Sequence, residues 1–392
     1  MSQQIPVNPV MLRWARETYG FGIDDVVVKL KRKRVTSETV ASWEKGTASP
    51  SYAQLERLAY EIYKRPLALF FFPEPPEEET PKESFRTLPQ EEIDLLEPRL
   101  LYLVRQAKVM QENLRELFDG VNPAEKQVYS DITIGKSTIS GVAKTVREYL
   151  DVSLDRQYAF TSNDIALKFW RNVLEKHGVF VFKDAFKDKD GECSGFCLYD
   201  DVFPIIFINN GQAKTRQIFT LFHELAHLLF KTGGVDLRHD EFIQRMRGPN
   251  RRVELFCNKF AGEFLVPTKD IKPRIGSRGI DDNLLTRLAD KYSVSREVIL
   301  RKCLDLKRIT KASYEAKVKE WDEDRLTRGR SGSGGNYYLT QGAYLGPHYI
   351  ETVFGKYYQG AISKTQVADY LGMKEANVNK FESSVFHGGI MA

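Results

Sequence analysis

The chain has 392 residues and a formal net charge of +5, a length sufficient for two or three domains that each bury a core. It has no apolar run as long as a membrane span, its N-terminus lacks the pattern of a signal peptide, and its four cysteines are few for this length. These features argue against membrane and disulfide-rich secreted proteins. We therefore expect a soluble cytoplasmic protein with no membrane partner.

Residues 1–73 contain short helical patterns at 11–19, 24–31, 36–45 and 51–63. The second and third have the dimensions of a helix-turn-helix, whose later helix enters the major groove by its N-terminal residues. We expect double-stranded DNA as a partner, with contacts from Lys31, Lys33, Arg34, Thr36, Ser37, Thr39 and Ser42. A solvated basic turn and a protein-docking module are the alternatives, since Asp24 and Asp25 place negative charge near the phosphates.

A proline-rich acidic stretch at 73–83 indicates an exposed linker, and we assign residues 74–150 to a linker and helical connector. A helix is expected over 162–177. Strands are expected at 178–182, 196–199 and 204–209, and we expect them to form a small sheet.

The most informative motif is His223-Glu224-Leu225-Ala226-His227, flanked by apolar residues on both sides. On a helix, imidazoles four positions apart lie on one face, so both reach one ion. Glu224 stands beside them, where it can act as general base on a water molecule. The motif predicts a catalytic metal site in a hydrolase; an ordinary amphipathic helix is the alternative.

A catalytic zinc usually takes three protein ligands, and Glu254 is the predicted third. It opens the pattern 254–267, in which phenylalanines recur at helical spacing, so a carboxylate on a neighbouring helix can face the two histidines. His239, Asp240 and Glu241 are the alternatives, in a polar stretch with weaker helical signals. Zn²⁺ is the expected cofactor. Mn²⁺ and Fe²⁺ are the alternatives, since availability in the cell can outweigh intrinsic affinity.

The N-terminal patterns also resemble a known family. The residues that carry the resemblance are Trp43-Glu44-Lys45-Gly46, Ala48-Ser49-Pro50 and Leu55-Glu56-Arg57-Leu58-Ala59. They closely resemble the Cro/repressor-like helix-turn-helix family, also called XRE. The resemblance implies a five-helix DNA-binding domain.

Residues 164–267 are similar to the ImmA/IrrE metallopeptidases. The matching residues are Arg216, Phe219-Thr220, the His223 to His227 motif, Glu254, Asn258, Phe260-Ala261 and Leu265-Val266-Pro267. The resemblance implies a metal-dependent endopeptidase that cleaves a DNA-bound repressor and switches on mobile-element or stress genes. It assigns His223, His227 and Glu254 to the metal and Glu224 to the general base.

Together these patterns predict an α+β, mostly α fold. Its parts are the N-terminal five-helix domain, a zincin-like metallopeptidase domain at 151–270 with a small sheet beside the HExxH helix, and a helical C-terminal region. Residues 271–328 are expected to form a helix-turn-helix-like domain that serves packing. Residues 329–392 are expected to form a flexible linker and a small helical region.

Two functions follow from the sequence. One is a metallo-endopeptidase with a DNA-binding domain, whose protein partner and substrate is a repressor-like or antitoxin-type protein. The other is a helix-turn-helix transcriptional regulator or antitoxin whose metal site is structural or sensory. An intact Glu224 favours the first, because a structural metal site needs no base. Tyr199 and His239 are the candidates for stabilising the oxyanion.

Overall fold

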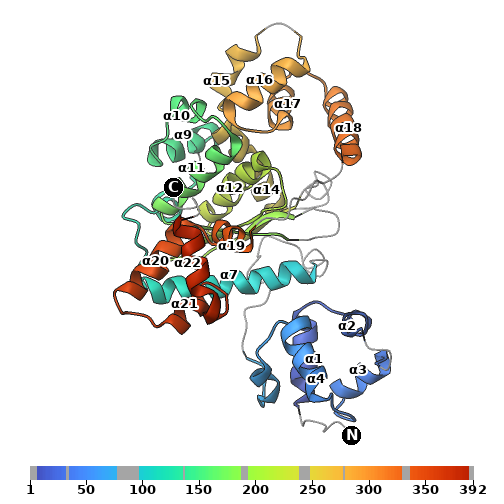
Figure 1. Cartoon of the computed structure of the whole chain (residues 1–392). Helices are drawn as coiled ribbons and strands as arrows, with labels where there is room; N and C mark the ends of the chain where they lie inside the picture. The colour runs from blue at the N-terminus through green and yellow to red at the C-terminus, as the bar shows by residue number, and fades with distance from the viewer. Residues whose placement is uncertain are drawn as a thin grey trace. The chain divides into compact units, whose positions relative to one another are not determined.

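The computed structural model describes residues 7–31, 35–76, 97–135, 137–186, 193–237, 248–276, 279–328 and 336–387. The chain forms two compact units, and the boundary between them lies within helix α7 (Pro98–Leu117), between Gln106 and Ala107. Figure 1 shows the short N-terminal helices in blue and the mixed helices and strands of the second unit from cyan to red. Among the described residues, each helix is too short or too polar to cross a bilayer.

The first unit consists of short helices around its own core. They are α1 (Pro9–Thr18), α2 (Ile23–Leu30), α3 (Ser37–Glu44), α4 (Tyr52–Arg57), the π-helical turn η1 (Leu58–Ile62) and the 3-10 helix η2 (Leu67–Phe71). Polar caps start two of them: the Asn8 side chain accepts from the Val10 N–H, and Thr36 accepts from the Thr39 N–H. The helix expected over 51–63 is thus divided, with a π-helical second half.

A partly buried ion pair fixes α3 against α1. Arg16 donates from Nε and Nη2 to the two carboxylate oxygens of Glu44, at 2.7 and 2.9 Å, and from Nη1 to the Phe21 carbonyl at 2.9 Å. This two-pronged geometry is the strong form of an arginine–carboxylate contact. It sets the direction of α3, the helix whose N-terminal end the sequence assigns to DNA.

The second unit surrounds a small sheet with helices. The helices up to residue 328 are α8 (Val128–Asp131), α9 (Ile139–Tyr149), α10 (Leu154–Tyr158), α11 (Asn163–Lys176), α12 (Lys214–Leu229), α14 (Gly248–Leu265), α15 (Thr268–Ile275), α16 (Asp282–Tyr292), α17 (Arg296–Asp305) and α18 (Lys311–Arg328). The strands are β1 (Phe180–Asp184), β2 (Cys193–Leu198), β3 (Ile205–Asn209) and β4 (Gly234–Leu237).

The sheet is mixed, with strand order β1-β3-β2-β4. Strand β1 runs parallel to β3, whereas β2 runs antiparallel to both β3 and β4. Helix α12 packs against β2, β3 and β4, and Figure 1 shows α12 and α14 on the same side of the sheet. The sequence patterns anticipated β1, β2 and β3 but not β4, whose four residues pair with β2 and carry too little alternation to identify them.

An aromatic cluster joins the two helices that matter most for the site. Trp170 of α11 meets the Phe222 ring of α12 edge-on at 5.0 Å, and Phe222 stacks on Phe264 of α14 at 4.1 Å. All three side chains are buried. Large rings on facing helices fix the helix separation because they bury much area in few conformations. The spacing of α12 and α14 therefore follows from this core.

Helices α16 and α17 are joined by a short turn in which Ser293 is left-handed and Ser295 caps α17. Helix α18 then packs against α17. The Arg296 guanidinium lies 4.6 Å from the Trp321 ring, and the Arg301 guanidinium lies 5.7 Å from the Tyr314 ring. These contacts join α17 to α18, whereas Arg296 and Glu297 at the N-terminal end of α17 remain exposed.

The C-terminal helices belong to the second unit. They are α19 (Tyr337–Leu345), α20 (Pro347–Tyr358), α21 (Lys364–Tyr370), the 3-10 helix η3 (Glu375–Asn377) and α22 (Val378–His387). Helix α19 packs against β1. The Tyr370 hydroxyl donates to Glu116 on the second half of α7 at 2.8 Å. This arrangement confirms the predicted fold class, a mostly helical α+β protein with a helical C-terminus.

Candidate metal centre

The two histidines of the HExxH motif lie one turn apart on α12, on the side that faces α14 and β4. The His223 and His227 rings are 5.0 Å apart, and their Nε2 atoms are separated by 3.2 Å. Their exposed fractions are 1% and 0%. Helix α12 packs against both the sheet and α14, so water does not reach these imidazoles. Their ring nitrogens must therefore hydrogen-bond to each other or bind a common ligand.

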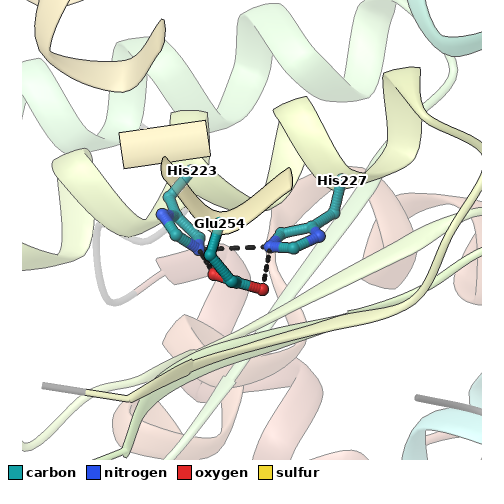
Figure 2. Close-up of side chains that lie close together, drawn as sticks. All are labelled: His223, His227 and Glu254. Carbon is teal, nitrogen blue, oxygen red and sulfur yellow. Dashed lines mark hydrogen bonds and ion pairs between the residues drawn. The ribbon is translucent and has the colours of Figure 1, made fainter. Parts of the chain in front are cut away.

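Glu254 of α14 completes the group. Its carboxylate oxygens lie 3.4 Å from His223 Nε2 and 3.2 Å from His227 Nε2. Figure 2 shows the three side chains pointing toward one another from the two helices. The expectation that Glu254 opens its helix was wrong, because α14 already begins at Gly248. Glu254 therefore lies within α14, in the part that packs against α12, and not at the helix end.

The group has the chemistry and the spacing of a metal site. Its three donor residues, two imidazoles and one carboxylate, form a set that zinc prefers in catalytic sites. Around a tetrahedral zinc with bonds of about 2.0–2.1 Å, neighbouring ligand atoms lie about 3.3 Å apart. The observed separations of 3.2 to 3.4 Å match that value. The residues present therefore fit a divalent metal.

Asn258 fixes the orientation of the first imidazole. The His223 Nδ1–H donates to Asn258 Oδ1 at 3.1 Å, so Nε2 is the ring nitrogen directed at the centre of the group. Asn258 lies one turn after Glu254 on the same helix. The i, i+4 spacing was visible in the sequence, but nothing in the sequence showed which imidazole the amide would reach.

The electrostatic setting favours positive charge at the group. Burial lowers the pKa of His223, but the charge of Asp236 and the hydrogen bond and charge of Glu254 outweigh it and raise that pKa to about 9. Burial acts to raise the pKa of Glu254, yet the charge of His227 and hydrogen bonds from both imidazoles hold it well below its usual range. The surroundings thus retain a proton where a metal cation would bind.

Glu224 lies between the histidines in sequence and is fully buried. The Cys197 thiol, a weak hydrogen-bond donor, lies close enough to interact with its carboxylate. Burial raises its pKa above the ordinary value for a glutamate. A buried carboxyl group with an increased proton affinity is suited to accept and release a proton during a reaction.

The other candidates for the site have different positions. His239, Asp240 and Glu241 lie outside the described residues. The Tyr199 hydroxyl donates to Asp201 at 2.6 Å, just beyond the end of β2. Among the described residues, His223, His227 and Glu254 form the one group of three or more potential ligands close enough to share an ion.

The residues assigned to DNA contact lie at the N-terminal end of α3 and before it. Lys31 is the exposed, left-handed C-cap of α2, whereas Lys33 and Arg34 lie outside the described residues. Three of the hydroxyl groups are engaged locally. Thr36 and Thr39 cap α3 together, and the Ser42 hydroxyl donates to the Thr39 carbonyl at 2.7 Å. Ser37 donates to Asp24 at 2.5 Å.

Comparison with known families supports the chemistry of the second unit. Residues 174–304 match the family model of the IrrE N-terminal-like domain, Peptidase_M78. The match runs from the end of α11 into α17 and contains the HExxH motif and Glu254, whereas the N-terminal helices lie outside it. No curated protein matches the chain to a significant degree. The chain therefore contains a metallopeptidase domain of this type, with a buried His-His-Glu group.

Proposed function

We propose that the chain is a metal-dependent endopeptidase that cleaves a repressor-like or antitoxin-type protein and so regulates transcription of stress or mobile-element genes. The observation that carries this proposal is the convergence of His223, His227 and Glu254 beside the buried Glu224, within an IrrE N-terminal-like domain. Zn²⁺ is the proposed metal, because two imidazoles and one carboxylate are its usual catalytic ligands.

The roles of the residues follow from their positions. A divalent cation held by His223, His227 and Glu254 would polarise the scissile carbonyl and acidify the attacking water. Glu224 takes the proton of that water and returns it to the leaving amine, a transfer for which its raised pKa suits it. Asn258 keeps the proton of His223 on Nδ1 throughout, so Nε2 stays available.

An extended peptide is the proposed form of the substrate. Strand β4 lies at an edge of the described sheet and directly beside α12, and an edge strand offers unpaired backbone groups to a peptide. The four site residues are at most 2% exposed, so cleavage requires that part of the surrounding chain move aside to admit the peptide. Such a site favours a selected protein target over general proteolysis.

The N-terminal unit is proposed to bind double-stranded DNA and so bring the peptidase to a DNA-bound target. Support comes from the exposed N-terminal end of α3 and from Arg16 and Glu44, which hold α3 in a fixed direction. Asp24 and Glu38 place negative charge on the same surface. We therefore expect modest affinity that depends strongly on salt.

Co-expression with repressor-like proteins encoded nearby tests the peptidase. The unaltered chain is expected to cleave one of them, and Glu224→Gln is expected to slow cleavage by about 10²- to 10⁴-fold while keeping its bound metal, because only the base is lost. Metal analysis of protein purified without added metal identifies the ion. The proposal fails if no partner is cut under any metal or stress condition.

The alternative function, a transcriptional regulator, predicts the opposite result for Glu224→Gln. If the metal site is structural or sensory, Glu224→Gln changes nothing, and the chain binds its own promoter tightly and with sequence specificity. Titration of fluorescent duplexes at several salt concentrations measures this binding. Lys31→Ala is expected to lower the salt slope by about 1 if Lys31 contacts a phosphate. Lys269→Ala, on the second unit, is the control and should leave the slope unchanged.

A further inference from the structure

We infer that Asp236 is a positioning residue for His227. It holds the edge strand β4 against α12, and in that position the backbone of Gly234 packs against the His227 ring. The inference rests on metal binding in the proposed function. Asp236 does not belong to the ligand group, and no sequence pattern marked it. Its role emerges from five contacts that join β4, β2 and α12.

Asp236 is anchored on both of its carboxylate oxygens. Oδ1 accepts from Arg216 Nη2 at 2.7 Å, and Oδ2 accepts from the Thr220 hydroxyl at 2.8 Å. Both donors belong to α12, while Asp236 belongs to β4 and is 3% exposed. A buried carboxylate that keeps its charge needs such donors, so the contacts bind the strand to the helix.

A β-bulge in β2 makes room for this network. Cys193 pairs with Leu237 and Gly195 pairs with Asp236, so Ser194 is the extra residue. Its hydroxyl accepts from Arg216 Nε at 2.8 Å. Bulges commonly redirect one side chain in this way. At Gly195 a Cβ atom would lie 2.6 Å from Thr220 Cγ2, so the absence of a side chain lets α12 approach the strands.

The same close approach reaches the metal ligand. A Cβ atom on Gly234 would lie 2.5 Å from Cγ and Cδ2 of the His227 ring. The Nδ1 atom of His227 has no hydrogen-bond partner among the described residues, whereas that of His223 is bonded to Asn258. The orientation of His227 is therefore set by packing against β4. Whatever holds β4 in place also holds this ligand.

Loss of the tether should loosen one ligand without removing any. In Asp236→Asn the amide cannot accept two hydrogen bonds at the former oxygen positions, and Arg216 loses its ion-pair partner. In Thr220→Val one tether contact is lost with no change in charge. The second variant separates positioning from the electrostatic effect of Asp236 on the imidazoles, because only the geometry changes.

The test is a chelator-competition titration of Zn²⁺ into the metal-free full-length chain, with stability measured alongside. We expect Asp236→Asn to weaken Zn²⁺ binding by about 10- to 100-fold and Thr220→Val by at least about 3-fold. Gly234→Ala should also weaken it, since the added methyl group displaces the ring. The control is Asp270→Asn, which disturbs another hydrogen-bonded carboxylate, held by Arg274 and two tyrosines, and should leave the affinity unchanged.

The outcomes separate this inference from the proposed function. If the unaltered chain binds no divalent metal, the proposed function fails. If it binds Zn²⁺ and Thr220→Val binds equally well, the positioning role is refuted, whether or not Asp236→Asn is weakened through its charge. If Asp236→Asn does not fold, Thr220→Val and Gly234→Ala decide. Unchanged affinity in Gly234→Ala also overturns the inference, because the ring contact would then be irrelevant.

Discussion

At the scale of single residues, the ligand group binds a positive charge whether or not a metal is present. His223 has a pKa of about 9 because the surrounding carboxylates outweigh its burial. A proton and a metal ion therefore compete for the same nitrogen. The two imidazoles are also supported differently, one by an amide hydrogen bond and the other by packing on a glycine. The state of this group should therefore depend on both the pH and the metal concentration.

This competition predicts a pH dependence. Folding raises the pKa of His223 from its ordinary value of 6.5 to about 9, so its stabilising proton is fully effective below pH 6.5 and is lost as the pH rises through 9. In metal-free protein, the stability difference between the unaltered chain and His223→Gln should fall by up to about 3 kcal/mol over this range. Denaturant unfolding at several pH values measures it.

Added Zn²⁺ should show the opposite trend, because it needs the neutral imidazole. The stabilisation due to Zn²⁺ is expected to grow from pH 6.5 to 9 in the unaltered chain. A stabilisation that is constant or that declines over this range would contradict the competition.

At the scale of elements, Arg171 of α11 connects the C-terminal helices to the sheet. It donates to the Ala343 and Leu345 carbonyls at 2.8 Å each, and pairs with Glu175 at 3.1 Å. Gly346 has a positive φ of 94°, and a Cβ atom there would lie 2.2 Å from Arg171. The last turn of α19 thus ends on a buried guanidinium that supplies the donors its carbonyls lack.

Arg171→Met is expected to destabilise the second unit by about 3–5 kcal/mol, because the buried Glu175 loses its guanidinium partner. Arg171→Met with Glu175→Leu should recover only part of this loss, since the α19 carbonyls still lack a donor. Lys356→Met is the matched control. It removes a 3.0 Å pair with the exposed Asp119 and should cost less than about 1 kcal/mol. Chemical denaturation measures the free energy of unfolding of both variants. Equal decreases for Arg171→Met and Lys356→Met would show that the buried pair contributes no more than the exposed one.

At the scale of the whole molecule, the two units have separate cores. One is built around Met11, Trp43 and Tyr63, and the other around Trp170, Phe222 and Phe264. The metal-ligand group lies entirely within the second. A ligand stabilises only the cooperative unit whose folded form binds it. Metal content should therefore change one part of the unfolding curve.

Calorimetry is expected to resolve two transitions, and chelation of the metal should lower only that of the second unit. A free metal concentration 100 times its Kd contributes about 2.7 kcal/mol, which corresponds to a shift of about 5–10 °C in a large domain. Arg16→Met identifies the other transition, because it leaves Glu44 of the first unit unpaired. If both transitions move together on chelation, the units do not unfold independently.

Much of the fold and of the site chemistry was accessible from the sequence. Helix periodicity is local, so the pattern around His223 to His227 identified both the helix and its ligand face. The mostly helical α+β class followed from similar patterns. Strand β4 could not be predicted in this way, because its four residues pair with β2, which lies far from them in the sequence. The start of α14 was misplaced for a related reason, because the segment before Glu254 lacks a strong apolar period.

The sequence by itself determined which side chains could bind a metal and that two of them share a helix face, because donor chemistry and helical spacing are properties of short segments. Only the tertiary structure decided that Glu254 meets the two histidines at 3.2 to 3.4 Å. It alone brought Asp236, Ser194 and Gly234 to the same helix. Those approaches depend on how α12, α14 and the sheet pack, and packing is set by contacts between residues far apart in the chain.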